Sequence, residues 1–212
     1  MSRRVAPLTL EALSDLPTRC RGCVAWELDP VSAGRAVAAG GTAFEKEAWL
    51  SEVLLQWGSA GRLAYVDDTL AGFVTYAPPV HVPRSRAFPT SPVSGDAVLL
   101  MTGYVEQRHR GGGIARMLVQ SAAKDLTQRG VRAIEAFGVA GTEADALDAG
   151  LSAGCMVPAA FFEAVGFTVV RPHHRYPRLR LELRTALSWR EDVEAALERI
   201  LGRARVPVLS GV

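Results

Sequence analysis

The apolar and polar residues of this chain form patterns that predict strands and helices in mixed order. Residues 97–105 (AVLLMTGYV) are apolar and β-prone, which predicts a buried strand. From Ile114 to Leu126 apolar residues recur at three- and four-residue spacing with polar residues between them, which predicts a helix with one apolar face. Three consecutive glycines, 111–113, stand between these two segments. The pattern is therefore strand, glycine-rich turn, helix.

Further elements are predicted on both sides of this unit. Residues 62–76 predict two strands joined by a turn at Asp67-Asp68, which is a β-hairpin. Residues 158–165 predict a short helix that a proline opens and Gly166 ends. The remaining predicted elements are strands at 133–139, 167–170 and 179–183 and helices at 43–55 and 188–203.

The glycine-rich turn predicts a phosphate site. The first amides of a helix have no partners within the helix, and the helix dipole favours an anion there. Glycines let the backbone approach such a ligand closely. A P-loop would need a Gly-Lys-Ser/Thr ending, which this turn lacks. Glu135 stands at the distance expected for the acidic residue of a dinucleotide fingerprint, but the glycines do not follow the order Gly-x-Gly-x-x-Gly.

The stretch 105–118 (VEQRHRGGGIARML) resembles the acyl-CoA signature of the GCN5-related N-acetyltransferases, the GNAT superfamily. The signature, Arg/Gln-x-x-Gly-x-Gly/Ala, is met by Arg110, Gly113 and Ala115. The resemblance covers about residues 62–183. It implies an α/β (α+β) fold with a mixed central sheet flanked by helices, in which strands splay around an acyl-CoA site.

The resemblance also implies how the chain is organised. It suggests a single domain over 1–212, in which 62–183 is the best-matched core. Residues 1–61 are then an N-terminal segment on the acceptor side, and 184–212 are a C-terminal helix and tail.

The resemblance implies a set of residues around the acyl-CoA. In the family a backbone amide of the strand before the loop polarises the thioester carbonyl, and Val105 is the best placed here. The amides after the strand would hold the pyrophosphate, and Phe162 would lie beside the pantetheine arm or in the core. The expected set is Gly103, Tyr104, Val105, Arg110, Gly111, Gly112, Gly113, Ile114, Ala115, Arg116 and Phe162.

Three carboxylates are candidates for the base that takes a proton from the attacking amine. Glu135 lies on the predicted strand 133–139, and the ribosomal-protein alanine acetyltransferases of this family carry a glutamate two residues further along, on the same face. Asp96 and Glu106 flank the strand before the glycine turn. For each of the three, a solvated surface charge is the alternative.

The residue that donates a proton to the leaving thiolate departs from the family pattern. Many members place a tyrosine four residues before the Gly of Gly-Phe, and here that position is Phe162, which has no proton to give. Tyr104 and Tyr176 are the tyrosine candidates for the acid. Cys155 and water are alternatives.

Residues 78–96 contain five prolines and no periodicity, which predicts an irregular connection without helix or central strand. It is either a wall of the acceptor site or a solvated loop. In the first case His81, Arg84 and Arg86 would favour an acidic acceptor.

Composition narrows the classes of protein. The 212 residues are 49% hydrophobic with a net charge of +2, so the chain can bury a sizeable core and shows no nucleic-acid footprint. The sequence has no apolar stretch of membrane-spanning length, so we expect no membrane partner and a cytoplasmic protein. Monomer and homodimer both remain open.

The three cysteines argue against a disulfide framework. Cys20 and Cys23 form a Cys-x-x-Cys that is either a pair of reduced thiols, a redox pair, or half of a zinc site completed by Cys155 or by His173 and His174. Because a single pair is weak evidence for metal, we expect no metal, with zinc as a minor alternative.

Two function classes follow. The first is an N-acyltransferase that moves an acetyl or other short acyl group from acyl-CoA, with acetyl-CoA as co-substrate, to an amine of a small molecule or protein by direct attack. The second is a non-catalytic acyl-CoA-binding sensor or regulatory protein, which Phe162 at the acid position favours.

Overall fold

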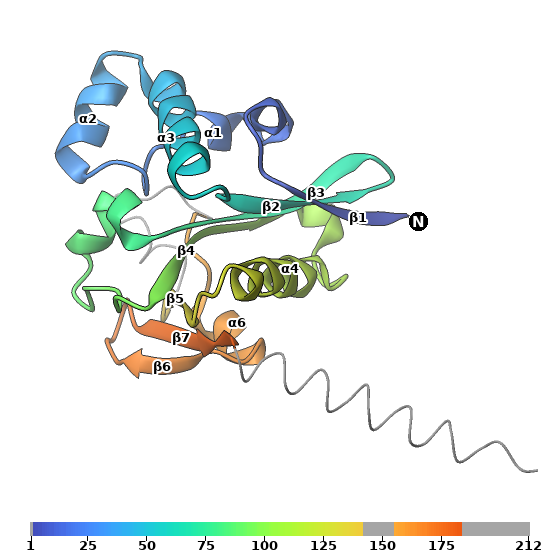
Figure 1. Ribbon diagram of the computed structural model, residues 1–212, viewed down its shortest axis with the longest axis vertical. Coiled ribbons are helices and arrows are strands. Elements are labelled where there is room, and N and C mark those ends of the chain that lie inside the picture. The colour runs from blue at the N-terminus through green and yellow to red at the C-terminus, as the bar shows by residue number, and fades with distance from the viewer. Residues whose placement is uncertain (1, 142–154, 184–212) are drawn as a thin grey trace, which may run out of the picture.

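A mixed β-sheet forms the centre of the protein (Figure 1). The structure is a computed structural model that describes residues 2–141 and 155–183. Over these residues the sheet has seven strands in the order β1-β2-β3-β4-β5-β7-β6. The β4–β5 pair is parallel, and every other pair of neighbouring strands is antiparallel. The strands are β1 Arg3–Pro7, β2 Gly61–Val66, β3 Thr69–Ala77, β4 Ala97–Val105, β5 Ala133–Phe137, β6 Thr168–Arg171 and β7 Arg178–Glu182.

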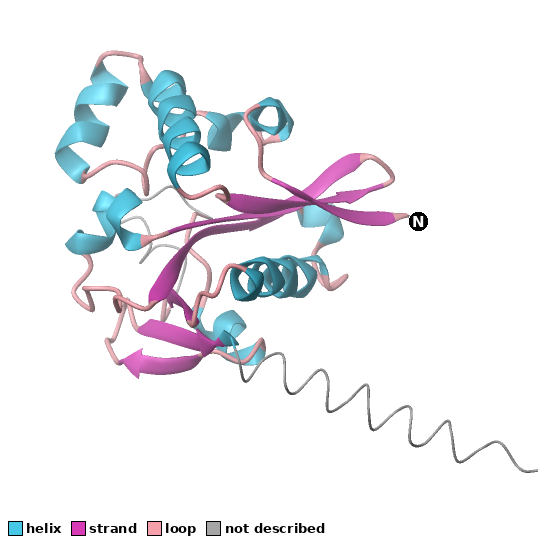
Figure 2. Cartoon of the chain, in the orientation of Figure 1, coloured by secondary structure: helices cyan, strands magenta, loops and turns pink. Residues whose placement is uncertain are grey.

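Helices cover both faces of the sheet. Figures 1 and 2 show α1, α2 and α3 on one side of the sheet and α4 and α6 on the other. The α-helices are α1 Thr18–Arg21, α2 Pro30–Ala38, α3 Thr42–Gln56, α4 Ile114–Gln128 and α6 Ala159–Ala164, and the 3-10 helices are η1 Glu11–Asp15, η2 Pro79–His81, η3 Pro83–Ala87 and η4 Gln107–His109. A mixed sheet flanked by helices confirms the predicted fold class.

Each face of the sheet has its own hydrophobic core. In β4, Leu99 and Met101 belong to the cluster beneath α1–α3, whereas Val98 and Leu100 belong to the cluster beneath α4 and α6. Successive side chains of a strand point to opposite faces. Because β4 is covered on both faces, its sequence is continuously apolar rather than alternating.

The hairpin of β2 and β3 confirms the turn predicted at Asp67-Asp68. The two strands pair antiparallel up to Val66 and Thr69, which leaves two residues in the turn. Asp67 and Asp68 have φ angles of 46° and 63°. Positive φ at both central residues is the geometry of a type I′ turn, which matches the twist of paired strands.

The proline-rich connection contains helices that its sequence did not predict, and it is not the solvated loop that was one of its two predicted alternatives. It contains the short 3-10 helices η2 and η3, each of which has a proline in its first turn, where no N–H is needed. It is also packed rather than solvated, since Val82, Phe88 and Val93 are buried in the core beneath α1–α3. Prolines therefore excluded long helices but not single turns.

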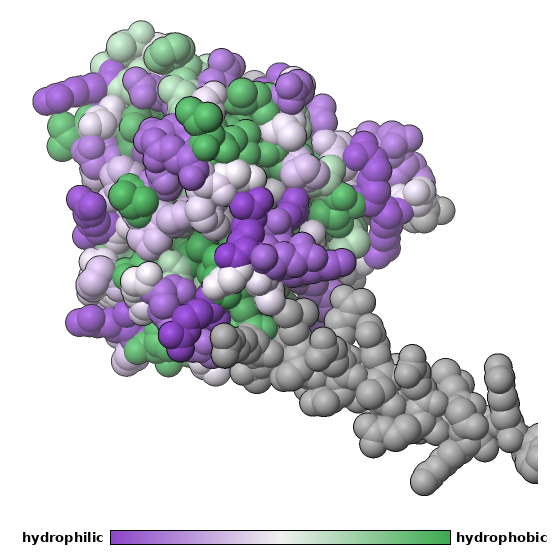
Figure 3. All heavy atoms as spheres, in the orientation of Figure 1, coloured by the Kyte–Doolittle hydropathy of each residue, from purple (hydrophilic) through white to green (hydrophobic). Residues whose placement is uncertain are grey.

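The outer surfaces of α2 and α3 carry exposed apolar side chains, and hydrophobic residues are visible in that region in Figure 3. Phe44 and Leu55 of α3 are 72% and 88% exposed.

Within the described ranges no helix combines the length and apolar character needed to cross a membrane. The predicted helix at 188–203 lies outside the described residues.

Candidate functional site

The site begins where β4 separates from β5. The parallel pairing of the two strands ends at Leu100 and Ala136, while β4 continues along β3 as far as Val105. A bulge in β4 shifts its register against β3, and the Thr75 hydroxyl oxygen there accepts a hydrogen bond of 3.2 Å from the N–H of Thr102. Because a bulge bends the strand that carries it, the last residues of β4 diverge from β5.

Two backbone amides of β4 face the opening that this divergence leaves. The N–H of Glu106 donates to the carbonyl of Ala71 at 2.9 Å, so it points toward β3. Backbone groups of successive residues in a strand point to opposite edges. The N–H groups of Gly103 and Val105 therefore point away from β3, toward the edge that β5 has left. This is the geometry required of the amide predicted to polarise a thioester carbonyl.

The glycine turn presents an open helix N-terminus beside this edge. Gly111 and Gly113 have φ angles of 75° and 82°, a left-handed conformation that favours glycine. Gly113 is the N-cap of α4, and neither a capping side chain nor an acidic residue occupies the first turn. The carbonyl of Gly112 accepts a hydrogen bond of 2.9 Å from Arg3, which ties the turn to β1. The free amides and the helix dipole together favour an anion at this position.

A cavity of about 510 Å³ connects the helix N-terminus with the end of β4. Its walls come from β4, from the turn and first half of α4, and from the segment that enters α6. Apart from Gly112, every residue expected around the acyl-CoA lines this cavity: Gly103, Tyr104, Val105, Arg110, Gly111, Gly113, Ile114, Ala115, Arg116 and Phe162.

The sequence did not lead us to predict one wall of the cavity. Met156, Val157 and Pro158 line it, and Pro158 forms an isolated bridge with Val139, just beyond β5. A Cβ at Gly103 would lie 2.6 Å from the Cγ2 atom of Val157, so this wall approaches β4 closely only because residue 103 is glycine. The sequence did contain a signal for this wall, because a glycine inside an apolar strand often marks a place where another segment lies close to the strand.

Phe162 has the surroundings expected for either of its two predicted roles. Its side chain is 1% exposed and lines the cavity. Its ring lies 5.0 Å from that of Phe167, between centroids. Phe162 therefore forms part of the apolar wall of the cavity, and it has no proton to donate.

Glu135 is not at the cavity, to which β5 contributes no residue. Its carboxylate is fully buried, forms an ion pair with Arg178, and accepts hydrogen bonds from Arg180 at 3.2 Å and from the Ser94 N–H at 3.1 Å. Burial alone would raise the pKa of Glu135, but the hydrogen bonds from Ser94 and Arg178 outweigh it and the pKa is lowered. These contacts favour a structural anion over the predicted base.

Asp96 and Tyr176 also lie apart from the cavity. Asp96 immediately precedes β4, at the end remote from the opening, and pairs with Arg180 at 2.9 Å. Tyr176 is buried edge-on against Phe88, with ring centroids 5.7 Å apart. Neither residue lines the cavity.

Among the acid and base candidates, Tyr104 lines the cavity, and Glu106 does not line it but contacts Tyr104. The hydroxyl of Tyr104 donates to a carboxylate oxygen of Glu106 at 2.5 Å. This hydrogen bond, reinforced by partial burial, raises the pKa of Tyr104. The guanidinium of Arg19 lies 5.1 Å from the centre of the Tyr104 ring. Of the five residues predicted as acid or base, only Tyr104 therefore borders the cavity.

The proline-rich connection borders the opposite face of the sheet. The indole N–H of Trp49 donates to the carbonyl of His81 at 2.7 Å, and His81 lies 3.9 Å from the carboxylate of Glu52. Arg84 is half-buried, which lowers its pKa, and it interacts electrostatically with Tyr176. Trp49 itself is a core residue.

Among the described residues, the structure gives Cys20 and Cys23 no set of metal ligands. Over residues 2–141 and 155–183 no group of three or more His, Cys, Asp and Glu side chains is arranged to hold a metal ion. The sulfur of Cys23 instead lies 3.9 Å from that of Cys155.

The fold and the site define an α/β protein in which a glycine turn opens a helix beside two splayed strands. The chain belongs to the acetyltransferase (GNAT) family, whose model matches residues 19–149. No curated protein matches the sequence.

Solved structures share the fold at low sequence identity. The PaiA N-acetyltransferase of Thermoplasma acidophilum, in complex with coenzyme A, is 14% identical with a TM-score of 0.54 over 86% of this chain and 99% of its own. An N-acetyltransferase of Staphylococcus aureus Mu50 is 16% identical, with a TM-score of 0.53 and coverage of 86% and 99%. The acetyltransferase yncA of Salmonella typhimurium, with acetyl-CoA, is 13% identical, with a TM-score of 0.53 and coverage of 86% and 95%.

Proposed function

We propose that this protein is an N-acyltransferase that moves an acetyl or other short acyl group from acyl-CoA to an amine. The observation that carries the proposal is the uncapped N-terminus of α4, with Gly111 and Gly113 at positive φ, opening into the cavity at the end of β4. Two structures with this fold are complexes with coenzyme A and acetyl-CoA, which supports the same ligand here.

The chain offers a place for each part of the ligand. The amides that open α4 would hold the pyrophosphate, and the apolar walls at Phe161 and Phe162 would pack along the pantetheine arm. The N–H of Val105 would donate to the thioester carbonyl oxygen, where negative charge develops as the amine attacks. The positions of these amides are fixed by β4 and α4 before any ligand binds.

The proton steps are assigned to the Tyr104–Glu106 pair. The amine nitrogen bonds to the thioester carbon, the carbon–sulfur bond breaks, and the thiolate leaves with the electron pair. Tyr104 would give its proton to this thiolate, and Glu106 would take the proton that the amine releases. A Tyr104→Phe variant should therefore lower kcat more than it raises KM for acyl-CoA.

The test is calorimetric titration of acetyl-CoA into the wild type and into Gly113→Glu. The control is Gly130→Glu, because Gly130 lies just beyond the other end of α4, has φ of 74°, and, like Gly113, has open space around an added Cβ. Both variants suffer the same backbone strain, about 1 kcal/mol, but only Gly113 borders the cavity.

We expect Gly113→Glu to abolish binding and Gly130→Glu to retain it. Release of CoA in the presence of polyamines, amino acids, aminoglycosides and peptide N-termini would then identify the acceptor. Absence of binding to the wild type, or equal loss in both variants, would overturn the proposal.

A non-catalytic acyl-CoA sensor is the second candidate. Phe162 at the acid position and Glu135 in a buried ion pair favour it, since neither can serve as the expected catalytic group. Binding of acetyl-CoA without CoA release for any amine of the panel would support the sensor over the enzyme.

A further inference from the structure

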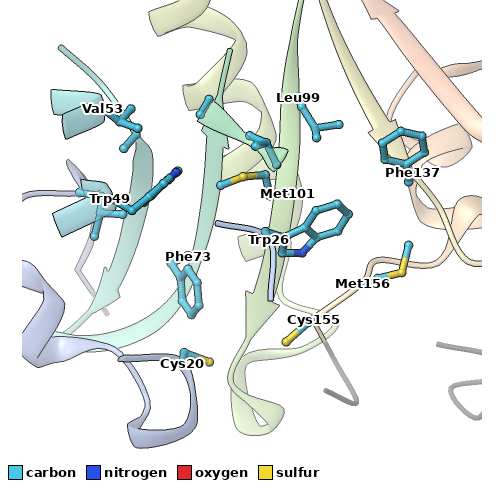
Figure 4. Packing of buried hydrophobic residues seen from close by; sticks show 14 of the residues in the cluster. Cys20, Trp26, Trp49, Val53, Phe73, Leu99, Met101, Phe137, Cys155 and Met156 are labelled. Carbon is cyan, nitrogen blue, oxygen red and sulfur yellow. The ribbon is translucent and has the colours of Figure 1, made fainter. Parts of the chain in front are cut away.

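Two cysteines that are far apart in the sequence meet beside the cavity. The sulfur atoms of Cys23 and Cys155 are 3.9 Å apart, although 132 positions separate the residues. Cys23 follows α1, on the side of the sheet that α1–α3 cover, and Cys155 begins the segment that leads into α6. Figure 4 shows Cys155 near Trp26 and Met156 in the core beneath α1–α3.

Cys155 is coupled by the chain to the cavity wall. The next three residues, 156–158, line the cavity, and Val157 packs against Gly103 of β4. The N–H of Val139 donates to the carbonyl of Val157 at 3.1 Å, and the N–H of Ala159 donates to the carbonyl of Val139 at 2.9 Å. A movement of Cys155 is therefore transmitted to the wall that faces β4.

We propose that Cys23 and Cys155 are a redox modification site, which a hydroperoxide converts into a reversible disulfide that deforms the cavity. The proposal differs from the Cys-x-x-Cys prediction, because the partner of Cys23 is Cys155 and not Cys20. Cytosolic disulfides, where they occur, are usually transient and serve redox sensing or catalysis.

The surroundings of the pair favour one thiol as the nucleophile. The contact with Cys155 lowers the pKa of Cys23 to about 6, against the opposing effect of burial, and raises the pKa of Cys155. The backbone of Ala25 also lowers the pKa of Cys23 by hydrogen bonding, while the buried ion pair of Glu27 and Lys46 acts in both directions, since Glu27 raises this pKa and Lys46 lowers it. Cys23 is also only partly buried, so a small oxidant can reach it, whereas Cys155 is 7% exposed.

The reaction balances in two steps. The Cys23 thiolate attacks a peroxide oxygen, the O–O bond breaks, and an alcohol or water leaves after taking a proton, so that Cys23 becomes a sulfenic acid. The Cys155 sulfur then attacks the Cys23 sulfur, the S–O bond breaks, and the hydroxyl leaves as water with the Cys155 proton. The peroxide is reduced and the two thiols are oxidised, and a dithiol reductant reverses the change.

Forming the bond requires movement. A disulfide holds its sulfurs about 2.05 Å apart, so the two atoms must approach by about 2 Å from their separation in the structure. The close contact of Val157 with Gly103 leaves little space on that side. Bond formation therefore pulls residues 156–158 out of their fit against β4.

The test treats the reduced full-length protein with hydrogen peroxide and counts free thiols after denaturation. We expect the count to fall from three to one, with Cys20 remaining free and peptide mapping showing a Cys23–Cys155 cross-link. The matched control is Cys20→Ala, which should still lose two thiols. Cys23→Ala and Cys155→Ala should form no intramolecular disulfide.

A functional readout, which rests on the proposed acyl-CoA binding, is the affinity for acetyl-CoA before and after oxidation. We expect a loss of roughly tenfold, restored by dithiothreitol and absent in Cys23→Ala. An unchanged thiol count, or a cross-link between Cys20 and Cys23, overturns the proposal. Because the thiol count needs no ligand, it decides the question even if the protein binds no acyl-CoA.

Discussion

The surroundings of each carboxylate separate a structural role from a chemical one. Glu135 is fully buried, and each of its two carboxylate oxygens pairs with an arginine. Neither oxygen is therefore free to accept a proton from a substrate. Glu106, like Glu135, does not line the cavity, but it is only partly buried and accepts a hydrogen bond from the hydroxyl of Tyr104, a residue that does line it. A base must reach the proton that it removes, so position decides between the two.

We predict that Glu135→Gln destabilises the protein by about 3 kcal/mol, because it leaves the buried charge of Arg178 without its anion. Chemical denaturation at pH 7 measures this change. The matched control is Asp96→Asn, which removes a more exposed partner of Arg180 and should cost less than about 1 kcal/mol.

The same residue predicts an effect of pH. The pKa of Glu135 is lowered in the folded state from the value of 4.5 expected when unfolded, so its ionisation stabilises the fold above pH 4.5. This contribution is lost as the pH falls below 4.5 and through the folded pKa. The free energy of unfolding should therefore decrease less steeply with acid in Glu135→Gln. A large loss of kcat in this variant at unchanged stability would instead restore Glu135 as the base.

At the scale of elements, the site depends on a local irregularity of β4. The bulge opposite Thr75 ends the pairing with β5 and turns the amides of Gly103 and Val105 toward open space. A regular strand would have continued beside β5 and closed the gap. The glycine turn then places the amides of α4 at the mouth of the same opening.

We predict that Thr75→Val destabilises the protein by about 1–2 kcal/mol and weakens acetyl-CoA binding. The Thr75 hydroxyl, in a side chain that is 1% exposed, accepts the N–H of Thr102 at the bulge, and valine leaves that donor unsatisfied. Urea denaturation and calorimetry measure the two effects. Thr75→Ser keeps the acceptor oxygen and should bind normally. Full binding by Thr75→Val would show that the bulge does not need this hydrogen bond.

At the scale of the whole molecule, the cavity joins parts that are distant in the sequence. β4, α4 and the segment entering α6 each form one wall, and the sheet between the two cores holds these walls in place. Figures 1 and 2 show how α4 and α6 lie on the same side of the sheet. A ligand that contacts all three walls binds only the folded chain.

Acetyl-CoA should accordingly raise the melting temperature. At a concentration 100-fold above Kd the stabilisation is about 2.7 kcal/mol, which corresponds to a shift of roughly 5–10 °C for a chain of this size. Differential scanning calorimetry measures the shift, with desulfo-CoA and free adenosine as ligand controls. If Gly113→Glu shows the same shift as the wild type, the ligand is bound elsewhere.

The sequence predicted the parts of the protein that depend on local pattern. A continuous apolar run identified β4, the three- and four-residue period of apolar residues identified α4, and the paired aspartates identified the hairpin turn. Each of these signals depends on neighbours within a few residues. The glycines predicted an open helix N-terminus for the same reason, and that N-terminus is present. The family resemblance supplied the expectation that this turn binds acyl-CoA.

What the tertiary structure decided is which side chains share a space. The sequence offered Glu135 as a candidate base and Tyr104 as a candidate acid. The packing of β5 against β7 buries Glu135 among arginines, whereas the end of β4 leaves Tyr104 at the cavity. Cys155 became the neighbour of Cys23 through the same long-range packing. Local periodicity carries no information about contacts between distant segments, because these depend on how the sheet is ordered and where its strands separate.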